Sequence, residues 1–95
     1  MVRVKTSTWD AADHLSSLDD MAAYLEAALE DGDATVIAAA LGDVARARGM
    51  SLVAAESGLG RESLYKALSA AGNPQLATVL SVLRALGLRL HVSPR

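Results

Sequence analysis

Cysteine is absent from this 95-residue sequence, which excludes a disulfide framework, a thiolate zinc site and a cysteine nucleophile. Aromatic residues make up only 3% and phenylalanine is missing, so Leu, Ala, Val and Ile must form the core. Alanine has the highest helix propensity and lets helices approach closely. The composition therefore predicts one all-α domain and excludes all-β folds and α/β barrels.

Long apolar runs and clustered catalytic residues are also missing. No run reaches the roughly 20 residues that a membrane-spanning helix needs, and the first 15 residues lack the apolar centre of a secretory signal. His14 and His91 are far apart, and no serine has a base nearby in the sequence. We expect a cytoplasmic, non-enzymatic protein with no membrane contact, no metal and no cofactor.

The net charge of −2 divides unevenly along the chain. Residues 1–45 carry two basic and nine acidic side chains, a net charge of −7. Residues 46–95 carry seven basic and two acidic side chains, a net charge of +5. An acidic half joined to a basic half indicates two surfaces with different partners.

Two long helices are predicted in the acidic half. The first covers residues 18–31, with Ser17 as its N-cap. The second starts after Asp33, another good N-cap, and is closed by Gly49. Inside this second helix, Gly42 costs about 1 kcal/mol relative to alanine. It indicates a close contact with another helix, or alternatively a local break.

Three shorter helices are predicted in the basic half. One covers residues 52–57 with Ser51 as its N-cap, and the next runs from residue 61 to about residue 70. The last has Asn73 as its N-cap and Pro74 at its first helical position. Its expected buried stripe consists of Leu76, Val79, Leu80, Leu83 and Leu86.

Both ends of the chain show the alternation that is typical of strands. Apolar residues alternate with basic or polar ones over residues 88–92, and residues 2–5 follow the same pattern. A lone strand leaves its backbone groups unpaired, so these strands could pair within one chain, between two subunits or with a partner's sheet. We divide the chain into a tail of residues 1–16 and a domain of residues 17–95.

Residues 50–70 have the spacing of a helix-turn-helix motif. Ala54 is small enough for a close helix crossing, and Gly58, four residues later, tolerates the positive φ of the turn. An ordinary helix–glycine–helix connection in a bundle gives a similar pattern, but this motif lies in the basic half. The core expected between the two helices consists of Val53, Leu59, Leu64 and Leu68.

The second helix of the motif carries a polar set on its first two turns. The amino end of such a helix is the part that reaches base edges in the major groove of DNA. This set consists of Arg61, Glu62, Ser63, Tyr65 and Lys66.

Residues 22–51 and 57–90 resemble the antidote proteins of addiction modules, which are HigA-like antitoxins with an Xre/Cro-type helix-turn-helix. The most specific phrases are RESLYKALS, GNP and VLRALGL. The resemblance implies a five-helix, lambda-repressor-like domain with the recognition helix at residues 61–70. It also implies a prokaryotic homodimer that neutralises a RelE/HigB-like ribonuclease toxin and represses its own operon on double-stranded operator DNA.

The resemblance carries over to individual positions of the recognition helix. Arg61 and Lys66 would donate to guanine or phosphate, and Glu62 would accept from a cytosine amine. Ser63 would read bases loosely, and Tyr65 would pack on a sugar or donate to a phosphate. Three further residues suit phosphate contacts, although capping or a solvated helix end explains them equally well: Ser51, Asn73 and Arg48.

Three positions depart from the family pattern. Leu52 and Ala55 replace a usual glutamine and a usual basic residue, and Gly60 replaces a usual capping serine. Each change removes a polar group near the DNA backbone, so DNA affinity depends more on dimer formation or on the toxin. The alternatives are a stand-alone Xre-family regulator without a toxin, and a protein-binding adaptor.

The acidic residues of the first helix have two interpretations. They form an ordinary solvated face, or they bind a basic toxin and guide its association electrostatically. Trp9 likewise has two interpretations. It anchors a small secondary core, or it anchors the interface with the toxin. The toxin-binding candidates are Trp9, Asp19, Asp20, Glu26 and Glu30.

Overall fold

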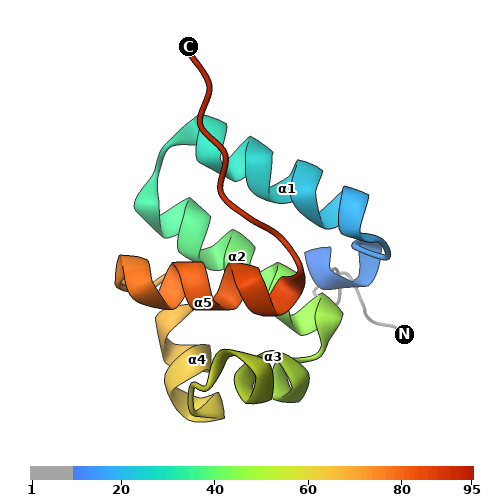
Figure 1. Ribbon diagram of the computed structural model, residues 1–95, viewed down its shortest axis with the longest axis vertical. Coiled ribbons are helices and arrows are strands. Elements are labelled where there is room, and N and C mark those ends of the chain that lie inside the picture. Colours follow the sequence, from blue (N-terminus) through green and yellow to red (C-terminus); the bar gives the residue numbers. More distant parts are fainter. Residues whose placement is uncertain (1–9) are drawn as a thin grey trace, which may run out of the picture.

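The computed structural model describes residues 10–95, and the regular structure within this range is entirely helical. In chain order the elements are the 3-10 helix η2 (Ala11–His14) and the α-helices α1 (Leu18–Asp31), α2 (Ala34–Arg48), α3 (Met50–Ser57), α4 (Arg61–Ala67) and α5 (Leu76–Leu86). The predicted all-α class with five α-helices is confirmed. Helix α1 lies at one end of the molecule, α3 and α4 lie at the other, and α2 and α5 lie between them (Figure 1).

The starts of α1 and α2 follow the predicted local signals. The Ser17 hydroxyl accepts a hydrogen bond from the Asp20 amide at 3.1 Å, and the Asp33 carboxylate accepts one from the Thr35 amide at 2.8 Å. Each bond satisfies an amide that has no partner within the first helical turn. The starts of both helices are therefore encoded by residues next to them in the sequence.

Helix α2 continues unbroken through Gly42, which is buried. A Cβ atom at this position would collide with the backbone carbonyl of Leu68, the residue that directly follows α4. The expected close contact is confirmed, and the neighbour is the backbone at the end of α4. The glycine thus lets the end of α4 lie directly against α2.

The predicted start of α3 is wrong. The helix begins at Met50 with Gly49 as its N-cap, and Ser51 lies in the first turn instead of capping it. No side chain caps this helix. The reason is packing, because Met50 is only 5% exposed and its burial brings the helix up to the glycine that closes α2.

Helix α4 ends at Ala67 and not near residue 70. The chain folds back tightly over its last turn, so a Cβ atom at Gly72 would collide with the Ala67 carbonyl. The Ser69 hydroxyl donates to the Lys66 carbonyl at 3.0 Å and satisfies one of the acceptors at this helix end. Leu68, the residue at which the helix ends, also lies against Gly42 of α2, so contact with α2 as well as this local turn accompanies the end of the helix.

The predicted start of α5 is also wrong. Asn73 does not cap the helix, Pro74 precedes it, and the helix begins at Leu76 with Gln75 in an extended conformation at the N-cap. Proline restricts its own φ but leaves ψ free, so it is compatible with a helix without requiring one. Residues 72–75 have no helical structure and connect α4 to α5.

No strand forms at residues 88–92, contrary to the prediction. The Leu88 amide donates to the Leu83 carbonyl at 2.8 Å, and the chain then runs past α1 without regular structure (Figure 1). A strand needs a partner, and residues 10–95 contain no other strand. The strand predicted at residues 2–5 lies outside the described residues.

The core receives buried side chains from all five α-helices, with α2 packed against α1, α3 and α5. Two members of the stripe predicted on α5 are not buried, since Leu76 is 66% exposed and Leu80 is 42% exposed. Among the described residues, no element packs over that side of the first turns of α5. The largest fully buried side chains are Leu41, Leu64, Leu86, Val44, Val53 and Val82.

Candidate nucleic-acid interface

The turn between α3 and α4 places the first residues of α4 at the surface. Gly58 has a φ of 76°, and its amide and the amide of Leu59 both donate to the Ala54 carbonyl, at 3.1 and 3.2 Å. The predicted positive φ is confirmed. Val53 and Leu64 are completely buried beneath this turn, so the angle between the two helices is set by packing as well as by the glycine.

The predicted polar set on α4 is exposed as a group. All five side chains face solvent, whereas Leu64 on the same helix faces the core. The Arg61 guanidinium lies 5.6 Å from the centre of the Tyr65 ring, within the range of a cation–π contact. Residues Glu62, Ser63, Tyr65 and Lys66 line a shallow hollow on this surface. The helix therefore presents donors and acceptors together.

No side chain caps the start of α4. Gly60 is the N-cap residue, and no side-chain hydrogen bond caps the helix there. This agrees with the predicted loss of a capping group at Gly60. The first amides of α4 have no intrahelical partner, so they are available to an acceptor such as a phosphate oxygen.

The three flanking residues proposed for phosphate contacts occupy different settings. Ser51 is exposed in the first turn of α3, and Arg48 is exposed at the last position of α2. Asn73 is exposed in the connection before α5, so it has no helix N-terminus of its own to offer a phosphate. Ser51 and Arg48 lie on either side of the short α2–α3 junction at Gly49.

A polar cluster between α1, α2 and the start of the described chain was not anticipated. The Arg46 guanidinium donates to Asp43 at 2.6 Å and to Asp10 at 2.9 Å, and the Tyr24 hydroxyl donates to Asp43 at 2.5 Å. The Asp43–Arg46 spacing of three residues on one helix was the available signal. Arg46 is therefore engaged within the protein, unlike the exposed Arg48.

This cluster changes the acidity of its members. The hydrogen bond from Arg46 holds the pKa of Asp10 below its ordinary value. The hydrogen bond to Asp43, together with partial burial, raises the pKa of Tyr24 to about 12. The cluster thus holds a neutral phenol next to charged groups and joins η2, α1 and α2.

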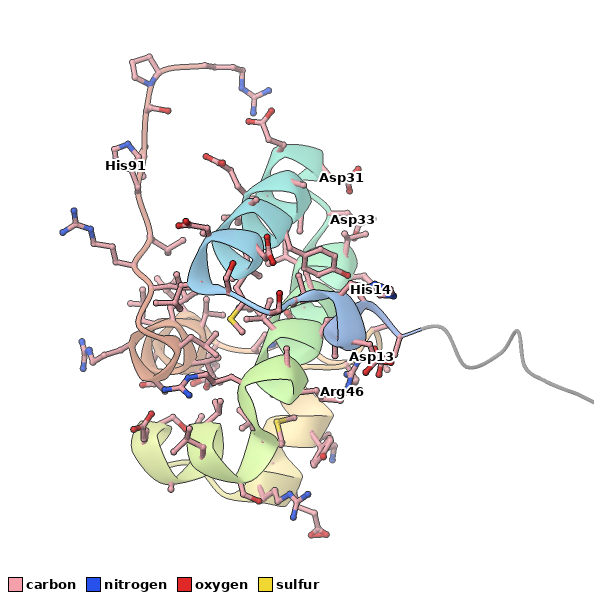
Figure 2. The ribbon with its side chains drawn as sticks, turned by 90° about the vertical axis from the view of Figure 1, so that its right-hand side faces the viewer. Asp13, His14, Asp31, Asp33, Arg46 and His91 are labelled. Atoms are coloured by element: carbon pink, nitrogen blue, oxygen red, sulfur yellow. The ribbon has the colours of Figure 1, made fainter. Side chains whose placement is uncertain are left out.

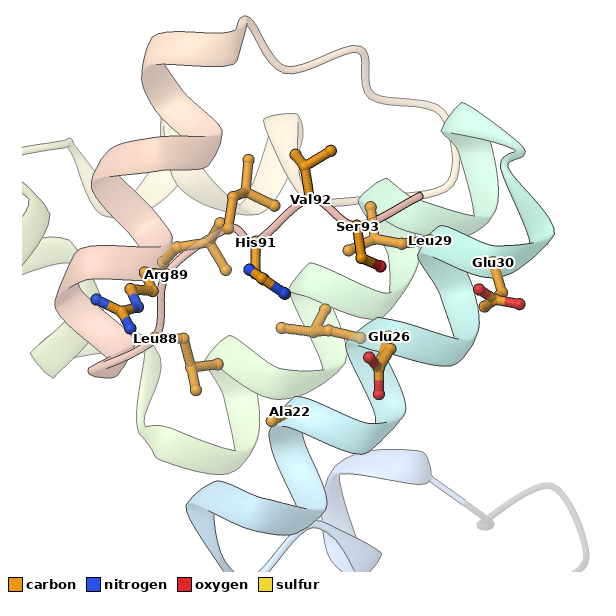
Figure 3. Close-up of a pocket in the computed structure, with 12 residues that line it drawn as sticks. Ala22, Glu26, Leu29, Glu30, Leu88, Arg89, His91, Val92 and Ser93 are labelled. Carbon is orange, nitrogen blue, oxygen red and sulfur yellow. The ribbon is translucent and has the colours of Figure 1, made fainter. Parts of the chain in front are cut away.

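The four toxin-binding candidates on α1 are exposed and fall into two groups. Asp19 and Asp20 occupy the first turn, where the Asp20 carboxylate accepts a hydrogen bond from the Ser16 hydroxyl at 3.2 Å. Glu26 and Glu30 lie further along and line a groove between α1 and the carboxy-terminal segment (Figure 3). The toxin-binding candidate Trp9 lies outside the described residues.

The remaining sequence candidates are not brought together. His14 and His91 lie on opposite sides of the molecule (Figure 2). Within residues 10–95, no three His, Asp or Glu side chains gather as potential metal ligands. No helix in this range is long and apolar enough to cross a membrane.

Comparison with known proteins identifies the family. Residues 5–94 match the model of the family described as "Probable addiction module antidote protein". The chain belongs to this family. An uncharacterized protein from Haemophilus influenzae is 48% identical over 84 residues, which cover 88% of this chain and 87% of that protein. No solved structure matches the chain.

Membership of the antidote family has two direct consequences. An addiction module antidote acts on a toxin, so the chain has a toxin partner, and its role is not enzymatic. The expected family resemblance is confirmed over nearly the whole chain.

Proposed function

We propose that this antidote neutralises a RelE/HigB-like ribonuclease toxin and represses its own operon, using α3 and α4 as a helix-turn-helix of the lambda-repressor type. The observation that carries the proposal is the arrangement of α4 in a chain of the antidote family. Its exposed surface holds Arg61, Ser63 and Lys66, whereas the fully buried Leu64 faces the core. Such a helix can enter the major groove with its amino end first.

The exposed side chains of α4 supply the chemistry for reading bases. Arg61 and Lys66 donate to guanine or to phosphate oxygens, and Glu62 accepts from a cytosine amine. Ser63 adapts to either kind of base edge. Tyr65 packs on a sugar or donates to a phosphate, and its contact with Arg61 limits the conformations of that long side chain.

One copy of the chain offers few side chains to the phosphate backbone of DNA. Ser51 and Arg48 are exposed and available for phosphates, but Leu52 and Ala55 present apolar side chains at the surface of α3. A homodimer compensates because it places two recognition helices on one operator. We therefore expect inverted half-sites about one DNA turn, roughly 34 Å, apart.

The acidic amino-terminal half supports the toxin-binding part of the proposal. Residues 1–45 carry a net charge of −7, and the acidic side chains of α1 are exposed. Asp19 and Asp20 near one end, and Glu26 and Glu30 further along, form a surface that attracts a cationic ribonuclease. Opposite charges of this kind accelerate association and favour the correct partner.

The DNA-binding part is tested with the double variant Arg61→Ala/Lys66→Ala in a mobility-shift titration of the operator upstream of the gene. Loss of base contacts of this kind costs about 1–3 kcal/mol each, so operator affinity should fall by at least about tenfold. The control Arg84→Ala/Arg89→Ala removes the same charge from exposed positions outside α4 and should keep most of the affinity. Equal affinity of the Arg61/Lys66 variant and the wild type would refute the recognition helix.

The toxin-binding part is tested by co-expressing the chain with the product of the neighbouring gene. We expect the two proteins to co-purify and the antidote to restore growth of cells that express the toxin. If they do not associate while operator binding is retained, the chain is a stand-alone regulator.

A further inference from the structure

The carboxy-terminal segment and α1 enclose a groove, lined by apolar and polar side chains, that has no role in the site on α4. Leu25 and Leu29 on α1 form one wall, and Leu88, Leu90 and His91 line the other. The Val92 side chain points away from α1 (Figure 3). Leu29 is 46% exposed, and Val92 is 89% exposed. Exposed apolar side chains that gather along a groove indicate a place for a partner.

The segment that borders this groove offers its backbone as well as its side chains. After the amide of Leu88, no backbone hydrogen bond joins residues 89–95 to any other described residue. The apolar positions alternate with Arg89 and His91, which is the pattern of a strand that has one apolar face. An extended segment of a partner can pair with such an edge by β-strand addition.

The groove also has a charged side. Glu26 and Glu30 project from α1 at one end, and Arg89 lies at the other end, close to α5 (Figure 3). No ion pair joins either glutamate to another described residue. The acidic end is therefore ready to receive a cationic side chain that follows the apolar part of a bound segment.

The position of the groove distinguishes a toxin from a second copy of the chain. The carboxy-terminal segment runs along α1 at the end of the molecule away from α3 and α4 (Figure 1). Antiparallel pairing of two copies through this segment would direct their α4 helices to opposite ends, away from a shared operator. A toxin bound here leaves α4 accessible to DNA.

We propose that the toxin docks in this groove through an extended segment that pairs with the backbone of residues 89–93. It places apolar side chains against Leu29 and Leu90, and a lysine or arginine beside Glu26 and Glu30. This inference rests on the proposed toxin partnership and assigns it a surface. It also separates the roles of the acidic residues, because Asp19 and Asp20 lie outside the groove.

The charged end is tested with Glu26→Lys/Glu30→Lys in a titration against the purified product of the neighbouring gene. We expect toxin affinity to fall by about tenfold or more. The control Asp31→Lys/Glu56→Lys makes the same change in net charge at exposed positions outside the groove and should change affinity by less than about threefold. Operator binding by each variant reports that the domain is folded.

The backbone edge is tested with prolines at two successive positions, because neighbouring amides of an extended segment point to opposite sides. One of His91→Pro and Val92→Pro should weaken toxin binding by roughly fivefold to tenfold, the effect of losing one hydrogen bond. His91→Ala and Val92→Ala retain the amide and serve as matched controls. Amides of residues 89–93 should also become protected from hydrogen exchange in the complex.

The outcomes separate the two proposals. A toxin that binds the wild type and all groove variants equally would overturn the docking site and leave the proposed function intact. A neighbouring-gene product that does not bind the wild type would overturn both. If the groove variants instead convert a dimer of the chain to monomers without affecting toxin binding, the groove belongs to a second copy.

Discussion

Gly42 shows how a single buried residue makes room for a distant part of the chain. Replacing an interior helical glycine with alanine normally stabilises a helix by about 1 kcal/mol. Here the new Cβ atom would collide with the Leu68 carbonyl, which belongs to the backbone and cannot move aside. We expect Gly42→Ala to lower the free energy of unfolding by about 1–3 kcal/mol in urea titrations.

The matched control for this variant is Gly60→Ser. Gly60 has an extended conformation that any residue can adopt, and a Cβ atom there would meet only the Ser63 hydroxyl, at an ordinary contact distance of 3.8 Å. A serine at this N-cap can bond to an amide of α4 and should raise the free energy of unfolding by a few tenths of a kcal/mol. If Gly42→Ala were as stable as the wild type, the contact between α2 and Leu68 would be looser than the structure shows.

Tyr24 makes stability depend on alkaline pH. Its pKa is about 12 in the folded chain, where the hydrogen bond to Asp43 favours the neutral phenol, and the ordinary value is 10.0. A raised folded-state pKa means that the stabilisation is complete below about pH 10 and is lost as pH rises through about 12. We expect the free energy of unfolding of the wild type to fall over this interval in urea titrations.

The variant Tyr24→Phe lacks this ionisation and isolates its contribution. Its unfolding free energy should depend less on pH between about pH 10 and 12 than that of the wild type. A spectrophotometric titration of phenolate absorbance provides an independent check, in which Asp43→Asn should shift the late-titrating tyrosine to lower pH. Identical pH dependence of wild type and Tyr24→Phe would contradict the cluster's role.

At the scale of elements, the orientation of α4 depends on the left-handed conformation of Gly58. A residue with a Cβ atom in this conformation costs about 1–2 kcal/mol. We expect Gly58→Ala to lower the free energy of unfolding by that amount. The loss in operator-binding free energy should be smaller than this loss in stability. Gly58→Asn should be closer to the wild type because asparagine tolerates this conformation better. Equal stability of all three chains would show that the turn can relax.

The helix boundaries also show the limit of local signals. Ser17 and Asp33 cap α1 and α2 as predicted, because each needs only an amide two or three residues away. Asn73 is an equally good capping residue but does not cap α5. The geometry of the connection from α4 decides that boundary, and no residue beside it reports that geometry.

At the scale of the whole molecule, the small net charge conceals a basic half that should make DNA binding strongly dependent on salt. Each neutralised phosphate releases counterions, so the logarithm of operator affinity should fall linearly with the logarithm of salt concentration. Arg48→Ala should reduce the magnitude of this slope by about one if Arg48 contacts a phosphate. Arg95→Ala, at the exposed end of the chain, should leave the slope unchanged.

A salt titration of operator binding by fluorescence anisotropy measures both slopes. Arg46→Ala is informative in the same experiment. Because Arg46 is engaged by Asp10 and Asp43, its removal should affect stability more than the salt slope. If Arg48→Ala and Arg95→Ala have the same slope as the wild type, phosphate binding does not involve the end of α2.

Much of the candidate site could be predicted from the residues alone. The positive φ of Gly58, the burial of Leu64 and the exposure of the polar set on α4 all follow from turn chemistry and helical periodicity. The cluster around Arg46 could not be predicted in full, because Asp10 and Tyr24 meet Asp43 and Arg46 only when α1 and η2 pack on α2.

The sequence by itself determined the all-α class, the helix starts that depend on a neighbouring cap, and the uneven charge, because these properties arise within a few residues or from composition. Only the tertiary structure decided where α4 ends, which leucines of α5 stay exposed and that residues 88–92 remain without a strand partner in the described chain. Burial, backbone collisions and strand pairing depend on segments that are distant in sequence, and only the folded chain brings those segments together.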